Sequence, residues 1–317
     1  RVLFRSMAIT AAMVKELREM TGAGMMDCKK ALNETNGNMD EAVEFLRKNG
    51  QAKAEKKASR IAAEGLCMVV TKDDQTAAVV EVNSETDFVA KNATFQEFVK
   101  AVATQAVNSD AADMDAFMAE KWNEDASKTV SEALVEKVAV IGENLKIRRF
   151  EKVVAEHGCV VPYVHGGGRI GVIVDADTDV VNDTVKEAMH NIAMQIAALN
   201  PKYVSRDEVS ADYIAHEKEI LLAQIMNDPK ESQKPEKVIN GMIEGRISKE
   251  LKEVCLVDQV YVKAEDGKQT VAKYLEEVSK AVGGTVKVKR FVRFETGEGL
   301  EKKQEDFAAE VAAQMNA

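Results

Sequence analysis

Residues 146–150, KIRRF, and residues 287–291, KVKRF, share one pattern in which basic and apolar side chains alternate. Alternation with a period of two is typical of a β-strand that buries one of its faces. Each segment follows two shorter β-rich runs and a helical pattern, so the order hairpin, helix, strand occurs twice. The chain is therefore predicted to belong to the α+β class, with two related subdomains that each consist of an antiparallel sheet and covering helices.

The β-rich runs that precede these strands come in pairs separated by short turns. Residues 65–71 and 75–82 form the first predicted hairpin, and residues 159–165 and 169–175 form the second. Runs of this length bounded by polar or glycine-rich turns are typical of hairpins. The other periodic segments predict helices at 95–107, 130–141 and 181–199 and closing strands at 145–154 and 285–295.

The first fifty residues carry three helical patterns in a row. Thr10 can cap the first pattern, which Gly22 and Gly24 end. Gly37 ends the second pattern, and Gly50 ends the third. Three short helices with a small shared core predict a compact docking module, similar to ubiquitin-associated domains. No catalytic side chain is visible in it.

The segment that follows the module is rich in lysine and arginine. Between Gln51 and Arg60, four basic residues stand against a single acidic one. Such a run either binds an acidic partner or forms a solvated linker helix, and the linker is the more frequent explanation.

Residues 207–255 interrupt the second half with two long helical patterns joined by a polar turn at 227–235. Two such patterns predict an antiparallel helical hairpin that projects from the body. The predicted domain plan is an extension or cloning remnant at 1–6 before a natural-looking start at Met7, a three-helix module at 7–50, a basic linker at 51–64, a first core subdomain at 65–155, a second at 156–296 that contains the hairpin, and a C-terminal helical module at 297–317.

The composition excludes several classes of protein. With 45% hydrophobic and 30% charged residues and only 4 prolines in 317 residues, the chain is neither disordered nor collagen-like. Its apolar runs are too short to span a bilayer. The net charge of −10 is unfavourable for binding nucleic acid. We therefore expect no membrane contact and no direct nucleic-acid contact.

The cysteines and histidines predict neither disulfides nor a metal site. The 4 cysteines are widely separated and too few to staple a chain of this length, which suits a reducing compartment. The 4 histidines do not form HExxH or a similar ligand spacing. We expect no metal and no cofactor.

Residues 166–171, GGGRIG, fit the GxGxxG pattern of dinucleotide-binding sites. That fingerprint needs a strand before it and a helix after it, because the helix N-terminus binds the pyrophosphate. Here a second strand is predicted after the glycines, so a glycine-rich hairpin turn is favoured. The sequence also lacks GxxxxGK[ST] and GxSxG motifs. These patterns therefore indicate no P-loop nucleotide site and no serine nucleophile of the GxSxG kind.

Residues 81–92, EVNSETDFVAKN, leave a predicted strand and place Phe88 directly after Asp87. In a generic sequence such a phenylalanine packs into the local core more often than not. The alternative is an exposed ring that contacts a partner.

Four segments together resemble the elongation factor Ts family of bacterial type, whose members are guanine nucleotide exchange factors of the GTPase elongation factor Tu. They are VKELR at 14–18 with TGAGMMDCKKAL at 21–32, TDFVAK at 86–91, HG at 165–166 with RIGV at 169–172, and DFAAEVA at 306–312. The resemblance extends from about residue 8 to the end of the chain. It implies a cytoplasmic translation factor that is not an enzyme, carries out no covalent chemistry, and binds elongation factor Tu in its GDP-bound and nucleotide-free forms.

The resemblance also implies which residues contact that partner. The family's TDFV segment enters the GTPase near its Mg²⁺ site, and it corresponds here to Thr86, Asp87, Phe88 and Val89. Other implied contacts are Arg18, Met25, Met26, His165, Phe307 and Val311. The helical hairpin resembles a coiled coil found in some members.

Two other functions remain open from the residues alone. A binding adaptor that acts through the three-helix module would fit the first sixty residues, but it leaves TDFVAK unexplained. A small-molecule enzyme that uses the glycine turn would need a catalytic constellation that the sequence does not offer.

Overall fold

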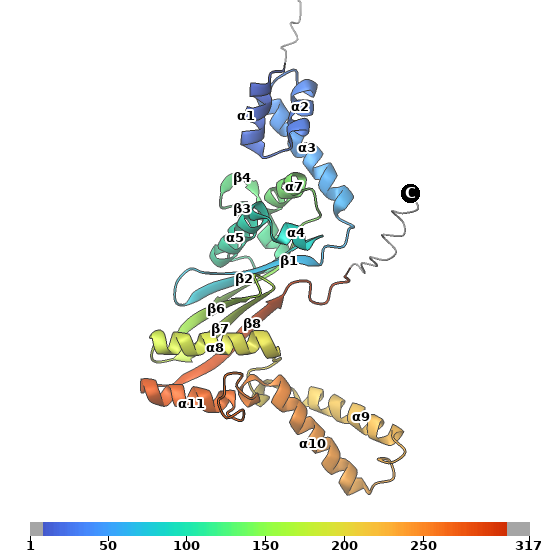
Figure 1. Cartoon of the computed structure of the whole chain (residues 1–317), viewed down its shortest axis with the longest axis vertical. Helices are drawn as coiled ribbons and strands as arrows, with labels where there is room; N and C mark the ends of the chain where they lie inside the picture. The colour runs from blue at the N-terminus through green and yellow to red at the C-terminus, as the bar shows by residue number, and fades with distance from the viewer. Residues whose placement is uncertain (1–8, 303–317) are drawn as a thin grey trace, which may run out of the picture. The chain divides into compact units, whose positions relative to one another are not determined.

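The computed structural model describes residues 9–302 of the chain (Figure 1). These residues pack into two compact units. Residues 9–68, 80–150 and 294–302 form the first unit, and residues 69–79 and 151–293 form the second. The boundary passes through strands, so each unit is built from segments that are distant in the sequence. The predicted domains are continuous stretches of sequence, whereas these units are not, so the predicted domain boundaries stay a prediction.

The first unit begins with the predicted three-helix module. It contains α1 (Ala11–Thr21), α2 (Met25–Glu34) and α3 (Met39–Lys57). Thr10 caps α1 by accepting a hydrogen bond from the Met13 N–H. Gly22 ends α1 in the left-handed region, with φ of 66°. The small shared core is fully buried at Leu17, Cys28, Ala31, Leu32 and Ala42.

The third helix corrects one prediction. Gly50 does not end α3, which continues to Lys57. Gly50 is buried, and a Cβ on it would lie 3.5 Å from the Cβ of Ala139. A small residue at this position lets α3 lie close to another helix, and this packing outweighs the poor helix propensity of glycine. Much of the predicted basic linker is thus the last part of a packed helix.

The rest of the first unit is the first subdomain. Its sheet has the strand order β1 (Glu64–Thr71), β2 (Thr76–Ser84), β5 (Lys146–Val154), and the sheet's strands extend across the unit boundary. The intervening chain forms α4 (Asp87–Ala90), α5 (Ala93–Asn108), α6 (Met114–Ala119), the short strands β3 (Lys121–Trp122) and β4 (Asp125–Thr129), and α7 (Val130–Ile141). The predicted helices at 95–107 and 130–141 are confirmed as α5 and α7.

The second unit repeats this topology. Its sheet has the order β6 (Cys159–His165), β7 (Ile170–Thr178), β8 (Val286–Glu295), so in both sheets a hairpin is extended by a later strand beside its second member. Helix α8 (Asp183–Leu199) lies across this sheet (Figure 1) and shares a core with it and with α11 (Val271–Val282). The α+β class and the two related antiparallel subdomains are confirmed.

The predicted helical hairpin is also present in the second unit. It consists of α9 (Ala211–Asn227) and α10 (Glu236–Val254), and the 3₁₀ turns η1 (Arg206–Glu208) and η2 (Leu256–Asp258) flank it. The two helices share a core of their own that contains Ile225, Ile239, Ile243, Ile247 and Leu251. The chain between β8 and residue 302 forms turns, and the remainder of the predicted C-terminal helical module lies outside the described residues.

A buried glutamine has the same role in each subdomain. The Gln105 amide in α5 donates to the Lys121 carbonyl at 3.2 Å and accepts from the Asn123 N–H at 2.9 Å. The Gln195 amide in α8 donates to the Val260 carbonyl at 3.0 Å and accepts from the Val262 N–H at 2.7 Å. Each side chain thus pairs with residues i and i+2 of an extended segment, which satisfies both of its polar ends in the core.

Candidate partner-binding site

The TDFV turn (residues 86–89) begins where β2 leaves the sheet. Strand β2 is buried from Ala77 to Ser84, and the chain then forms α4, a helix of only four residues. Thr86 caps this helix by accepting a hydrogen bond from the Val89 N–H at 3.4 Å. The Ser84 hydroxyl donates to the Thr86 carbonyl at 3.0 Å. Side-chain hydrogen bonds therefore define a turn that is too short to be stable as an isolated helix.

Phe88 is the most exposed large apolar side chain in residues 9–302. Its exposed fraction is 79%, slightly above the 75% of Met26. The prediction that a generic phenylalanine here packs into the local core is wrong for this chain. Burying such a ring against a partner contributes roughly 1.5–3 kcal/mol. The exposed ring is therefore a candidate contact for a partner.

The neighbours of Phe88 are less free. The Asp87 carboxylate lies 2.6 Å from the Lys91 ammonium, and this hydrogen bond lowers the pKa of Asp87 below its ordinary value. Val89 is half-buried, and Ala90 is buried. The turn therefore exposes one aromatic ring beside a carboxylate that is ionised at neutral pH and forms an ion pair with a lysine.

A loop from the far end of α7 lies against the base of the turn. The Glu143 carboxylate accepts hydrogen bonds from the Thr86 hydroxyl at 2.7 Å, the Thr86 N–H at 3.1 Å and the Glu85 N–H at 3.0 Å. In return, the Glu85 carboxylate accepts from the Asn144 N–H at 2.6 Å. Sequence analysis missed Glu143, and no local pattern marks it, because its partners lie 57–58 positions away.

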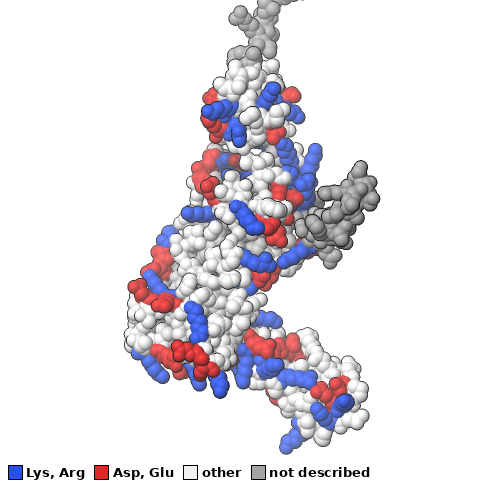
Figure 2. All heavy atoms as spheres, viewed as in Figure 1, with Lys and Arg blue, Asp and Glu red and all other residues white. Residues whose placement is uncertain are grey.

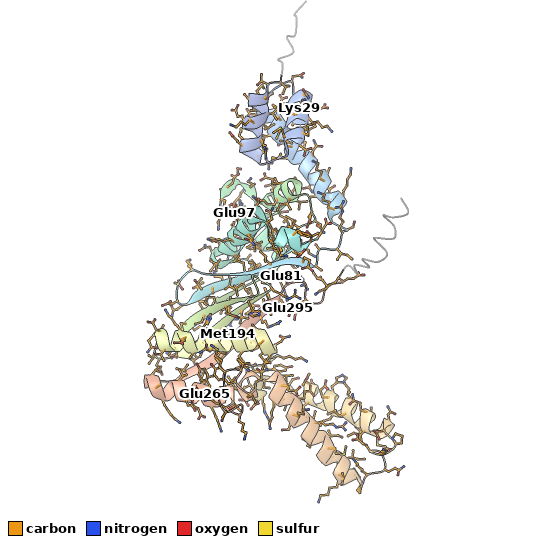
Figure 3. All side chains as sticks on the ribbon, in the orientation of Figure 1. Lys29, Glu81, Glu97, Met194, Glu265 and Glu295 are labelled. Atoms are coloured by element: carbon orange, nitrogen blue, oxygen red, sulfur yellow. The ribbon has the colours of Figure 1, made fainter. Side chains whose placement is uncertain are left out.

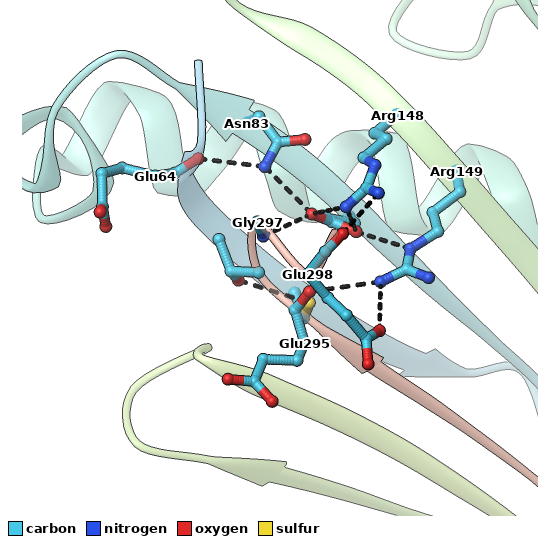
Figure 4. Close-up of polar contacts among 10 residues, drawn as sticks. Glu64, Asn83, Arg148, Arg149, Glu295, Gly297 and Glu298 are labelled. Atoms are coloured by element: carbon cyan, nitrogen blue, oxygen red, sulfur yellow. Dashed lines mark hydrogen bonds and ion pairs between the residues drawn. The ribbon is translucent and has the colours of Figure 1, made fainter. Parts of the chain in front are cut away.

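A buried carboxylate sits on the strand that leads into the turn (Figure 4). Glu81 is fully buried and accepts hydrogen bonds from Arg148, Arg149, Asn83 and the Gly297 N–H. Burial alone would raise its pKa, but these hydrogen bonds and the Arg149 charge outweigh burial and lower the pKa below its ordinary value. Glu81 therefore stays ionised inside the first unit.

The same arginines hold the chain after β8. Arg148 donates to the Glu298 carbonyl at 2.6 Å, and Arg149 donates to the Glu295 carbonyl at 3.2 Å. Gly297 has a φ of 73°, and a Cβ on it would lie 2.1 Å from the Ala63 carbonyl oxygen. Glu81 and the two arginines thus fix residues 295–298 within the first unit.

The helical module exposes the predicted contact residues Arg18, Met25 and Met26. Met25 is 58% exposed and Met26 75%, so neither side chain belongs to the module's core. Met20 is 60% exposed, and sequence analysis did not single it out. Figure 2 shows lysine and arginine interspersed with aspartate and glutamate over the visible face of the module.

His165 belongs to the second unit, where it is the last residue of β6. Its Nδ1 lies 2.9 Å from the Tyr163 hydroxyl, and the imidazole is exposed. Strands β6 and β7 pair antiparallel from Cys159↔Ala176 to His165↔Ile170. The glycine-rich hairpin turn is therefore confirmed, because a strand follows the glycines where a dinucleotide site needs a helix. Two further predicted contacts, Phe307 and Val311, lie outside the described residues.

A cavity of about 540 Å³ in the first unit lies between the helical module and α7. Its walls include the ion pairs Lys53–Asp27 at 2.8 Å and Arg47–Glu132 at 3.1 Å. Among the described residues that line it, none is histidine or cysteine. Across residues 9–302 no three acidic, histidine or cysteine side chains gather closely enough to hold a metal ion. No helix in that range has the length and apolar character to cross a bilayer.

Comparison with known proteins identifies the family. The profile of the family described as Elongation factor TS matches residues 85–298, which include the TDFV turn. Elongation factor Ts of Clostridioides difficile (strain 630) is 53% identical over 308 residues, which cover 97% of this chain and 99% of that protein. Elongation factor Ts of Clostridium novyi (strain NT) is 51% identical over 309 residues, with the same coverage. The chain belongs to the elongation factor Ts family.

Proposed function

We propose that this chain is a guanine nucleotide exchange factor of elongation factor Tu and acts in the cytoplasm. It binds the GDP-bound partner, promotes GDP release and leaves a nucleotide-free complex that GTP can reload. The proposal is supported by family membership and by one observation in particular, the 79% exposure of Phe88 on a turn that is held by hydrogen bonds. No covalent step and no cofactor are part of it.

The proposed mechanism uses Phe88 as a wedge. A GTPase holds its nucleotide through Mg²⁺ and a phosphate-binding loop, so a ring that displaces those elements weakens both contacts together. Burial of one phenylalanine contributes roughly 1.5–3 kcal/mol, which corresponds to an acceleration of one to two decades if all of it favours the open state. A larger acceleration requires further contacts, and we assign these to Arg18, Met25, Met26 and His165.

Asp87 has a secondary role in this mechanism. Its carboxylate would approach the phosphate and Mg²⁺ site with Phe88, where a negative charge competes with the phosphates for the cation. Lys91 lies 2.6 Å from it in the free protein and partly neutralises that charge. We therefore assign the larger share of the exchange activity to Phe88.

The first experiment measures release of labelled GDP from elongation factor Tu with and without the chain. We expect strong acceleration by the unmutated chain and a much lower maximal release rate with Phe88→Ala, while association changes less. Phe88→Ala should leave the melting temperature unchanged, because the ring is exposed. Absence of acceleration by the unmutated chain would rule out the exchange function. Normal acceleration by Phe88→Ala would rule out only the wedge.

A second experiment uses thermodynamic linkage. A protein that weakens GDP binding must itself be weakened by GDP by the same free energy. Calorimetry should therefore show tighter binding to nucleotide-free elongation factor Tu than to the GDP-bound form. Equal affinities would contradict the exchange mechanism and would favour the alternative, a binding adaptor that acts through the helical module.

A further inference from the structure

We propose that Glu143 is a positioning residue for the TDFV turn, which it holds in the conformation that presents Phe88. This inference rests on the proposed function, because it assigns a role within the same site. Glu143 lies in the loop between α7 and β5 and is half-buried. This loop is distant in sequence from the turn to which Glu143 binds.

The Glu143 carboxylate accepts hydrogen bonds from three donors at the start of the turn. One carboxylate oxygen accepts from two consecutive backbone N–H groups, those of Glu85 and Thr86, at 3.0 and 3.1 Å. The other oxygen accepts from the Thr86 hydroxyl at 2.7 Å. These N–H groups lie between the end of β2 and the start of α4. Hydrogen bonds to a charged acceptor are stronger than those between neutral groups.

The Thr86 hydroxyl connects Glu143 to the N-terminal cap of α4. It donates its single proton to Glu143 and accepts from the Val89 N–H, which is the capping bond of α4. The bond to Glu143 therefore directs a lone pair of the hydroxyl toward the helix. If the carboxylate were removed, the hydroxyl could rotate and the cap of a four-residue helix would weaken.

A third segment of the chain holds the residues on either side of Glu143. The Lys57 ammonium donates to the Gly142 carbonyl at 2.6 Å, and the Asn144 amide donates to the Arg60 carbonyl at 2.8 Å. The Asn144 N–H also binds Glu85. The loop at 142–144 thus joins the end of α3 to the turn, and Glu143 lies at the centre of this connection.

These contacts bear on exchange through the fraction of molecules in which the turn is ready to insert. An anchored turn loses little conformational freedom when the ring enters its partner. Without the anchor only a fraction of turns is competent, and the insertion equilibrium falls by that fraction. Because Glu143 and its partners are only half-buried, water replaces most of the lost hydrogen bonding, and loss of the carboxylate should lower that fraction about tenfold.

The test is a titration of the full chain against elongation factor Tu with labelled GDP. Glu143→Ala should lower the maximal release rate about tenfold, whereas the concentration for half-maximal effect should change by less than about twofold, because other surfaces bind the partner. Glu143→Gln should retain most of the rate, since its amide can accept from the two N–H groups and donate to Thr86. Glu97→Ala is the matched control, an exposed glutamate on α5 (Figure 3), and should behave as the unmutated chain.

A double variant separates positioning from an independent contribution. Adding Glu143→Ala to Phe88→Ala should cost less than about twofold, because the ring that Glu143 positions is already absent. Multiplication of the two effects would overturn the proposal. It would also be overturned by a normal maximal rate for Glu143→Ala, or by an increase in the half-maximal concentration alone, which is the result of a partly unfolded protein. If the unmutated chain does not accelerate GDP release, the proposed function fails. If the unmutated chain accelerates release and Glu143→Ala accelerates it as well as the Glu97→Ala control does, only this inference fails.

Discussion

The Oε2 atom of Glu81 lies 2.6 Å from the Nε atom of Arg149, and the two residues belong to neighbouring strands, β2 and β5. Arg148 adds hydrogen bonds at 3.0 and 3.2 Å, and the Gly297 N–H adds one at 2.8 Å. A buried charge needs such a set of partners, because desolvation otherwise costs more than one ion pair returns. The same carboxylate is therefore sensitive to substitution and to pH.

Glu81→Ala should destabilise the protein by about 3–5 kcal/mol, because it leaves two largely buried arginines without their shared counter-ion. Glu81→Gln should cost less, since the amide oxygen still accepts from Arg149 or Gly297. Denaturant unfolding measures both values. Glu156→Ala is a suitable control, because it removes a glutamate whose side chain is 82% exposed. A cost for Glu81→Ala equal to that of the control would show that the cluster contributes nothing.

The difference in unfolding free energy between the unmutated protein and Glu81→Gln should depend on pH. The pKa of Glu81 is lowered in the folded state, so the unfolded chain binds the proton first as pH falls. The contribution of the charge is therefore complete above the unfolded pKa of about 4.3 and is lost as pH falls through the folded pKa. Urea unfolding between neutral and acidic pH should show the difference shrinking over that window. A difference that grows toward acid pH would contradict the assignment.

Replacing the two exposed methionines at the start of α2, Met25→Ala with Met26→Ala, should weaken binding to elongation factor Tu and leave the protein folded. Both side chains are more than half exposed, so truncation creates no cavity. Leu32→Ala in the same helix is the contrasting control, because Leu32 is fully buried and its truncation should cost about 2–5 kcal/mol. Calorimetric binding and melting temperature distinguish the two effects. A lower melting temperature for the methionine variant with unchanged affinity would refute the contact.

Gly50→Ala should stabilise the protein by up to about 1 kcal/mol, because alanine has the higher helix propensity. The added methyl group would lie 3.5 Å from Ala139 and 3.9 Å from Val135, which is ordinary contact. Gly50→Leu should instead destabilise, since its larger side chain has to separate α3 from α7. Thermal unfolding compares the two variants, and a lower melting temperature for the alanine variant would show that the helices cannot adjust.

Gln105→Met and Gln195→Met should each destabilise the protein by about 1–3 kcal/mol, because a carbonyl and an N–H lose their buried partner. The similar geometry of the two amides predicts that the two costs agree within a factor of two to three. Gln51→Met, at an exposed position on α3, should have little effect. Strongly unequal costs, measured by denaturant unfolding, would show that the repeated geometry does not carry a repeated energetic role.

The repeated topology could be predicted because it depends on local patterns, namely alternating strands such as those around Ile147 and Val288 and the helical periods between them. The C-terminal end of α3 was predicted wrongly at Gly50, because tertiary packing against Ala139, and not helix propensity, determines whether the helix continues there. The elements from α6 to β4 were not predicted, because this segment carries no long apolar period. The partners of Glu143 lie too far away in sequence for any local pattern to reveal them. The exposure of Phe88 likewise depends on the folded chain, and the family resemblance alone pointed to it.

The hydrogen bond from Gly297 to Glu81 joins residues 216 positions apart. A ribosome makes the chain from its N-terminus, so Glu81, Arg148 and Arg149 emerge long before Gly297 and Glu298 exist. During that interval the carboxylate lacks its backbone donor, and the arginines lack the carbonyls of Glu295 and Glu298. Domains whose contacts are distant in sequence complete their folding late in synthesis. The first unit therefore reaches its final packing only after residues 295–298 have been translated.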